Sequence, residues 1–379
     1  MNSGRFIIFF SVIMVLYGTL HVYAVSRIWP FLGPQQWMKT SLIGLAMFLF
    51  LSYPLGRFLE RYYLNVFSHG LVTFGAFWMA AIVYLVIGLA FVHAASKWVP
   101  ALPFIWAGLG VGLMTLTLII WGHWNATNSK VSTFDLVVDK PLPKPEFRLV
   151  VVSDIHMGTI VSKERVRILV EEINALSADL VLLPGDMLDE DLKPVVQGNL
   201  GAYLTRIQSR YGVYASTGNH EYIGGVNLGV RYLEDHGVRV LRDEWVMVAD
   251  SIVVVGREDV AAARFAGVLG KSLAEIMKGV DRRKVLIVLD HTPVRLKEAE
   301  GERLDLSLSG HTHHGQFWPW NLLTKAIYEV SRGYLKKDNT HILVSSGYGT
   351  WGPPVRIGSR SEILLVKLRS GILQKPVAP

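Results

Sequence analysis

The sequence contains no cysteine, and its first 129 residues contain a single acidic residue, Glu60. Without thiolates, the chain can form neither a disulfide framework nor a soft, cysteine-based metal site. The acid-poor part carries six Lys or Arg residues, whereas the rest carries 32 basic and 30 acidic residues and is close to neutral. Nucleic-acid binding needs basic residues concentrated on the binding domain, so this balance argues against a nucleic-acid partner.

Charged residues are also missing from four long apolar stretches, residues 6–26, 40–56, 71–94 and 102–122. Each stretch is close to the roughly 20 residues that a helix needs to cross a bilayer. Tryptophans near their ends are typical of membrane interfaces. These are Trp29, Trp37, Trp98, Trp121 and Trp124. We therefore predict an α-helical membrane domain of about four spans.

Other interpretations of these stretches exist. The first follows Arg5 and contains "VYA" at 22–24, as a cleavable signal peptide would, although its length favours a retained helix. The second is the shortest and has Pro54 near its end, which makes it the least secure span. All four could be buried core helices, but four charge-poor segments in series favour the membrane.

Positive charge is unevenly distributed over the loops between the spans. One side of the membrane would receive Arg5, Arg57, Arg61, Lys130, Lys140, Lys144 and Arg148, and the other Arg27, Lys39 and Lys97. The side with more Lys and Arg usually faces the cytoplasm. We therefore expect a multi-pass protein of the cell (inner) membrane whose catalytic domain lies in the cytoplasm.

The composition changes after the fourth stretch. Residues 126–146 are polar, contain three prolines and can hold one strand, so they are predicted to be a linker. The expected organisation is a transmembrane helical domain at 1–125, this linker, a catalytic domain at 147–370 and a tail at 371–379.

Short apolar runs alternate with helical patterns in the predicted catalytic domain, residues 147–370. Eight runs predict buried strands: 147–154, 179–186, 212–219, 251–256, 284–291, 304–311, 340–347 and 361–368. Between the first two runs, apolar residues recur at helical spacing behind Ser162, a candidate N-cap. Strands alternating with helices predict an α/β domain.

Polar side chains stand where five of these strands end, the usual position of sites in α/β sheets. They are Asp154, His156, Asp186, Asn219, His220, His291, His311 and His313. Carboxylate, amide and imidazole donors suit Mn²⁺, Fe²⁺ or Zn²⁺. So many donors exceed the needs of one ion, whereas two ions bridged by a shared carboxylate could clamp both oxygens of a phosphoryl displacement.

The same residues carry a family resemblance. The blocks "SDIH" (153–156), "PGDM" (184–187), "TGNHE" (217–221), "DH" (290–291) and "GHTHHGQ" (310–316) resemble, in order, the five signature blocks of calcineurin-like metallophosphoesterases. Residues 345–368 are similar to the membrane-associated branch of that family. The resemblance implies a layered β-sandwich flanked by helices, here preceded by the membrane helices.

The resemblance also implies roles for the individual residues. Asp154, His156 and His313 would bind one metal, Asn219, His291 and His311 the other, and Asp186 would bridge them. His220 would contact the substrate phosphate and protonate the leaving oxygen, and a metal-bridging hydroxide would be the nucleophile. Two divalent ions are therefore expected, with Mn²⁺ preferred over Fe²⁺ or Zn²⁺. Because His311 and His313 are two apart on a segment expected to be extended, they should point to the same side.

Three features of the last block extend or depart from the pattern. Gln316 matches the family and is expected to orient a ligand. His314 replaces the glycine common in the membrane-associated branch, and either contacts substrate or is a solvated bystander. The segment 317–337 mixes aromatic and basic residues, and forms either an interfacial helix on lipid or a lid packed on its own domain.

The sequence thus predicts a membrane-anchored, metal-dependent phosphoesterase that hydrolyses a phosphodiester or pyrophosphate bond, with a lipid-linked substrate favoured. The alternative is a phosphomonoesterase acting on a lipid or small molecule. A non-catalytic scaffold would lack some ligands, whereas all are present, and the charge-poor spans weaken a transport function. The expected partners are the bilayer and the phosphoester substrate.

Overall fold

The computed structural model describes residues 3–99 and 103–372, so most of the predicted tail at 371–379 lies outside the described residues. The chain divides into two compact units. One comprises Met1–Trp124 with Gly352–Val355, and the other comprises Asn125–Trp351 with Arg356–Pro379. The domain boundaries inferred above stay a prediction.

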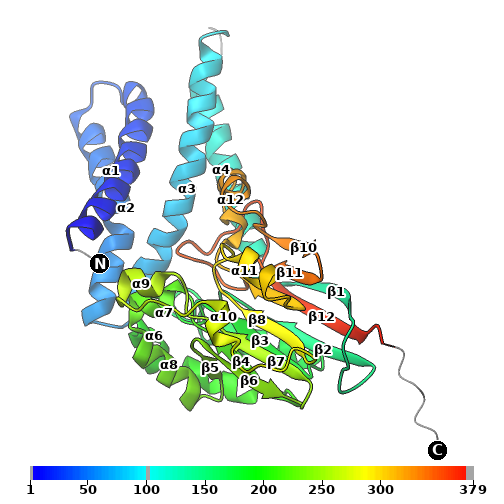
Figure 1. The fold of residues 1–379 in the computed structure, drawn as a ribbon. Helices are drawn as coiled ribbons and strands as arrows, with labels where there is room; N and C mark the ends of the chain where they lie inside the picture. Colours follow the sequence, from blue (N-terminus) through cyan, green and yellow to red (C-terminus); the bar gives the residue numbers. More distant parts are fainter. Residues whose placement is uncertain (1–2, 100–102, 373–379) are drawn as a thin grey trace, which may run out of the picture. The chain divides into compact units, whose positions relative to one another are not determined.

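The helical unit contains the four predicted apolar helices, drawn from blue to cyan in Figure 1. They are α1 (Ser3–Ile28), α2 (Gln36–Tyr62), α3 (Val66–Ser96) and α4 (Phe104–Thr127), with the short helix η1 (Trp29–Leu32) after α1. All four are long and apolar enough to cross a membrane. The second span, doubted because of Pro54, is a 27-residue helix with that proline inside it.

Small residues allow close packing between α2 and α3. A Cβ atom on Gly75 would lie 2.4 Å from the backbone nitrogen of Tyr53, and one on Gly56 would lie 2.8 Å from that of Val72. Such backbone approach is a common means of association between membrane helices. His21 joins α1 to α3, because its Nε2 accepts a 2.8 Å hydrogen bond from the indole nitrogen of Trp78.

The other unit is built on two six-stranded sheets. The first has the order β1-β12-β2-β3-β4-β5 and the second β10-β11-β9-β8-β7-β6. The strands of the first are β1 (Lys130–Val138), β2 (Glu146–Val151), β3 (Leu180–Pro184), β4 (Val213–Ser216), β5 (Arg239–Leu241) and β12 (Glu362–Ser370). Those of the second are β6 (Glu244–Val248), β7 (Ile252–Gly256), β8 (Val285–Leu289), β9 (Leu306–Ser309), β10 (Gly333–Lys337) and β11 (Thr340–Val344).

Helices cover the outer faces of both sheets. The helices of this unit are α5 (Lys163–Ala175), α6 (Leu192–Gln197), α7 (Asn219–Gly224), α8 (Val226–Asp235), α9 (Ala261–Phe265), α10 (Leu273–Ile276), α11 (Leu296–Gly301) and α12 (Trp320–Ile327), with the short helices η2 (Leu200–Arg206) and η3 (His313–Gly315). The side chains of α5, α6, η2 and α8 pack on the first sheet, and those of α10 and α11 on the second. The expected layered α/β sandwich is confirmed.

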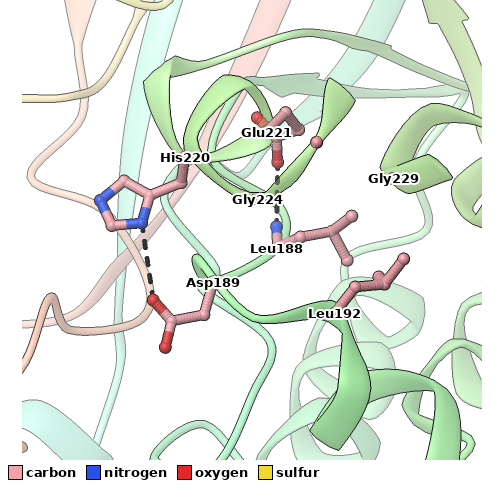
Figure 2. A pocket seen from close by; sticks show the side chains of 8 residues that line it. Leu188, Asp189, Leu192, His220, Glu221, Gly224 and Gly229 are labelled. Atoms are coloured by element: carbon pink, nitrogen blue, oxygen red, sulfur yellow. Dashed lines mark hydrogen bonds and ion pairs between the residues drawn. The ribbon is translucent and has the colours of Figure 1, made fainter. Parts of the chain in front are cut away.

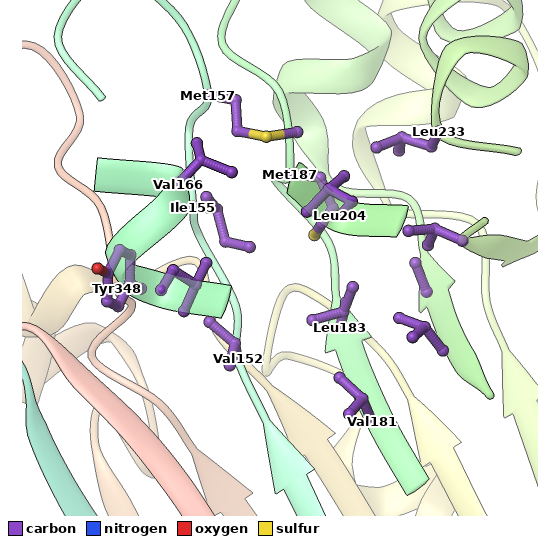
Figure 3. Packing of buried hydrophobic residues seen from close by; sticks show 14 of the residues in the cluster. Val152, Ile155, Met157, Val166, Val181, Leu183, Met187, Leu204, Leu233 and Tyr348 are labelled. Carbon is purple, nitrogen blue, oxygen red and sulfur yellow. The ribbon is translucent and has the colours of Figure 1, made fainter. Parts of the chain in front are cut away.

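Successive side chains along a strand point to opposite faces of the first sheet. Val181 and Leu183 of β3 join the helix-facing core, which Figure 3 shows beside Val166 of α5. Their neighbours Leu180 and Leu182 join the core between the sheets. Both faces are buried, which is why these strands are almost continuously apolar in sequence.

Each of the eight predicted strands overlaps a strand of the structure, and the predicted helix is α5. Ser162 occupies the N-cap position of α5, as predicted, but its side chain makes no capping hydrogen bond. The prediction of an interfacial helix in the segment 317–337 was also only partly right. The helix α12 ends at Ile327, and residues 333–337 form β10, which pairs with β11. Side chains of β10 alternate between half-buried and exposed, a pattern too short and polar to recognise in advance.

Candidate metal centre

The eight predicted site residues follow the carboxyl ends of five strands, β2, β3, β4, β8 and β9. Within each sheet, the strands that carry these residues run parallel, so their carboxyl ends lie along one edge of the sheet. The structure gathers the ligating atoms into three overlapping groups, within each of which the atoms lie within 4.8 Å of one another. The groups are Asp154–His156–His313, His156–Asp186–His220 and Asp186–His291–His311.

One cluster contains Asp154, His156 and His313. The Nε2 atom of His313 lies 3.4 Å from Oδ1 of Asp154 and 3.1 Å from Nε2 of His156. Burial, aided by the neighbouring imidazoles, lowers the pKa of His156 to about 3 and that of His313 well below its ordinary value. Neutral imidazole is the form in which histidine binds a metal, and here the Nε2 atoms of two such rings converge.

The second cluster contains Asp186, Asn219, His291 and His311. Oδ1 of Asn219 lies 2.8 Å from Nδ1 of His311 and 3.3 Å from Nε2 of His291. The same Nε2 of His291 lies 3.1 Å from Oδ2 of Asp186. A carboxylate oxygen, an amide oxygen and two imidazole nitrogens therefore face one small volume.

Asp186 belongs to both clusters. Its Oδ2 atom, 3.1 Å from His291, is also 3.9 Å from Nε2 of His156, and its Oδ1 accepts a 2.8 Å hydrogen bond from the backbone of His220. Burial opposes ionisation of this carboxyl, but the charges of His291 and His220 hold its pKa well below the usual range. The carboxylate therefore stays ionised between the clusters.

The backbone under these ligands is strained. Asp154, His156, Asp186, His311 and His313 have φ angles of 53°, 52°, 52°, 67° and 44°. Residues with a Cβ rarely adopt this left-handed region, at a cost of roughly 1–3 kcal/mol each, and such residues cluster at functional sites. The expectation that His311 and His313 share an extended segment was therefore wrong: sharp turns, rather than strand alternation, direct their rings.

His291 is fixed by its other ring nitrogen. Nδ1 lies 2.9 Å from the carbonyl oxygen of Pro184, which can only accept, so Nδ1 carries a proton and Nε2 is the ring nitrogen that faces Asp186. Gly185 makes room for this ring. A Cβ at that position would lie 2.5 Å from Nδ1 of His291.

His220 lies beside both clusters and pairs with Asp189, a residue that the sequence did not single out (Figure 2). Nδ1 of His220 is 3.5 Å from Oδ1 of Asp189. Burial disfavours the charged ring, but Asp186 and Asp189 outweigh it and raise the pKa of His220 to about 9. The imidazole is consequently a cation at neutral pH and can serve as a proton donor.

Glu221 joins the loops that carry Asp186 and Asn219. Its Oε2 accepts hydrogen bonds from the backbone nitrogens of Gly218 (2.7 Å) and Asp186 (3.1 Å), and its Oε1 accepts one from Leu188 (3.0 Å). The sequence placed this residue inside the "TGNHE" block but gave no signal of its positioning role.

Arg356 is a further residue that sequence reasoning missed. Its buried guanidinium lies 3.1 Å from Nδ1 of His313 and donates to the carbonyl oxygens of Ser346 (2.7 Å) and Gly347 (3.1 Å). Burial lowers its pKa to about 10, so it remains charged. The contact restricts the rotation of the His313 ring.

The remaining residues of the last block have other partners. The Gln316 amide donates to the carbonyl of Trp351 (3.1 Å) and accepts from its backbone nitrogen (3.0 Å), so these contacts bind the loop to Trp351. His314 is half-buried with Nδ1 3.1 Å from Oγ of Ser331. Substrate contact by His314 stays a prediction.

Comparison with known proteins identifies the family of this chain. The model of the calcineurin-like phosphoesterase domain matches residues 147–315. An uncharacterized metallophosphoesterase from Aquifex aeolicus is 31% identical over 252 residues, which cover 66% of this chain and 95% of that protein. The chain belongs to the calcineurin-like phosphoesterase family. It is therefore a metal-dependent phosphoester hydrolase.

Other relatives are longer than the matched region. A metallophosphoesterase from Helicobacter pylori is 34% identical over 63% of this chain and 64% of its own length. A transmembrane protein with a metallophosphoesterase domain from Danio rerio is 31% identical over 68% of this chain and 61% of its own length. This chain thus spans less than two thirds of both proteins. The second relative and the four apolar helices indicate a membrane protein.

We predict that Gly185→Ala weakens divalent-metal binding roughly 10- to 100-fold, because the new methyl group displaces the ring of His291. Gly212→Ala is the matched control. Both glycines have positive φ (77° and 91°), but a Cβ on Gly212 comes no closer than 3.5 Å to any neighbour. The left-handed backbone alone should cost both variants roughly 1–2 kcal/mol of folding stability, and Gly185→Ala should lose more because its methyl group meets the ring of His291. Titration calorimetry with Mn²⁺ and thermal unfolding measure the two effects; equal metal affinity in both variants would contradict the assignment of His291.

Proposed function

We propose that the two clusters hold two divalent ions, and that the protein hydrolyses a phosphodiester or pyrophosphate bond in a lipid-linked substrate. Asp154, His156 and His313 would hold one ion and Asn219, His291 and His311 the other, with Asp186 shared. The observation that carries this proposal is the position of Asp186 Oδ2, within 3.1 Å of His291 and 3.9 Å of His156.

The chemistry of the donors fits such ions. Buried carboxylates, an amide oxygen and imidazoles match Mn²⁺, Fe²⁺ or Zn²⁺, and we propose Mn²⁺ as the native metal. Nδ1 of His156 is buried and has no hydrogen-bond partner among the residues that the structure describes. Its Nε2, only 3.1 Å from that of His313, gains little from that contact unless a cation lies between.

Bound divalent ions would lower the pKa of a water molecule and stabilise negative charge on the phosphoryl oxygens. The chain itself supplies the proton for the leaving oxygen. Nδ1 of His220 lies 3.5 Å from Oδ1 of Asp189, which leaves Nε2 for the substrate. We propose His220 as the general acid and Asp189 as the residue that positions it.

The membrane helices support a lipid-linked substrate. Four apolar helices in the same chain keep the catalytic unit at a bilayer, where an amphiphilic phosphoester is concentrated. The distribution of Lys and Arg supports a cytoplasmic catalytic unit in the inner membrane. A phosphomonoesterase acting on a lipid or small molecule is the alternative, since the same donors can bind either ester.

We predict that the full-length protein, purified in detergent with Mn²⁺, hydrolyses an aryl phosphodiester faster than the matching monoester. The bridging carboxylate is required in either case, so Asp186→Ala should abolish both activities. Steady-state rates on the two substrates decide the ester class. A clear preference for the monoester would overturn the diester proposal and leave the metal centre intact.

Replacing His220 should affect poor leaving groups most. His220→Asn should retain its bound metal but lose roughly 10²- to 10⁴-fold in kcat on an alkyl diester, which needs a proton on departure. The loss should be much smaller with a nitrophenolate leaving group. His236→Asn, a ring whose Nδ1 contacts the carbonyl of Tyr232, is the control. Equal losses on both substrates would exclude His220 as the acid, and loss of metal would make it a ligand instead.

A further inference from the structure

The helix α12, orange in Figure 1, is inverted relative to an ordinary surface helix. Its polar residues Asn321 and Thr324 are half-buried against the domain. Its apolar residues face outward, with Trp320, Leu322, Leu323 and Ile327 exposed by 52%, 57%, 59% and 62%. An amphipathic helix normally turns its apolar side to the core. This arrangement indicates that the outward side meets an apolar environment.

The helix is rigidly attached to the metal loop. A Cβ on Gly315 would lie 2.3 Å from the backbone nitrogen of Asn321, so the loop and the first turn of α12 are in direct backbone contact. Gly315 closes η3, which begins at the predicted ligand His313. Phe317, between loop and helix, forms a bridge with Ile357. A surface that held α12 would therefore also fix the distance between that surface and the metal centre.

The chemistry of the exposed side suits a lipid interface. Trp318, exposed by 48%, lies two residues before α12, and the hydrogen bonds of Gln316 hold Trp351, exposed by 58%, beside the metal loop. Lys325 is exposed on α12, and residues 317–328 contain no acid. Tryptophan, leucine and lysine without acidic residues are typical of helices that lie in the plane of an anionic membrane.

We propose that α12, with Trp318 and Trp351, docks on the bilayer in which this same chain is anchored. The four apolar helices make that bilayer the surface always available to it. Docking holds the metal centre at the level of the lipid headgroups. The consequence for the substrate rests on the proposed function: docking then defines the substrate as an amphiphile whose scissile phosphoester lies among the headgroups.

The absence of cysteine allows a direct test. Leu323→Cys provides a unique thiol for an environment-sensitive fluorophore on full-length protein in nanodiscs of phosphatidylethanolamine and phosphatidylglycerol. Leu228→Cys on α8, exposed by 68%, is the matched control. The label at 323 should emit at shorter wavelength and be quenched by nitroxide-bearing lipid, whereas the label at 228 should be quenched only by aqueous iodide.

Other occupants of this surface give different results. Iodide quenching at both positions would overturn the docking. Lipid quenching at both positions would also overturn it, because membrane contact would then not be specific to α12. A label at 323 that is shielded from iodide but not quenched by lipid would indicate a protein occupant, either the helical unit or a second copy, and would equally overturn it.

A kinetic measurement tests the consequence for substrate access. Leu323→Ser should raise the KM for a phosphodiester anchored in vesicles of the same lipids by about fivefold, since one leucine leaves the interface. It should leave the hydrolysis of a soluble aryl diester unchanged. Equal losses on both substrates would overturn the link between docking and access. If neither diester is hydrolysed by the unmodified protein, the proposed function fails while the fluorescence result still decides docking.

Discussion

The site depends on the buried carboxylate of Asp186. One of its oxygens lies within reach of imidazoles from both clusters, and the other is fixed by the backbone of His220. A buried charge of this kind is costly unless cations and hydrogen bonds surround it. Glu221 maintains the arrangement by accepting hydrogen bonds from the backbone nitrogens of Asp186 and Gly218, which brings the loops after β3 and β4 together.

The two sheets make this convergence possible. β2, β3 and β4 carry one part of the donor set, and β8 and β9 carry the other. The apolar core between the sheets fixes their separation, so loops from both can face one volume. The left-handed backbone of Asp154, Asp186 and His311 then turns the side chains inward at an energetic cost that the surrounding core must offset.

The sequence predicted those features that have a periodic or chemical signal. Long charge-free stretches predicted the four helices, and polar residues after apolar runs predicted the strand ends. Asp189 and Arg356 could not be found in this way, because their roles arise from contacts with His220 and His313 that only the folded chain creates. β10 was missed because its stability comes from pairing with β11, while its own residues, "GYLKK", have no apolar face. The direction of the His311 and His313 rings was likewise set by backbone turns that have no sequence periodicity.

The metal content of the purified full-length protein tests the central claim most directly. Elemental analysis after Mn²⁺ loading should give two ions per chain, one in Asp154→Ala or in Asn219→Ala, and fewer than one in Asp186→Ala, provided that each variant is shown to be folded. A single ion in the unaltered protein, or an unchanged content in Asp186→Ala, would contradict an account in which this carboxylate joins two metal sites.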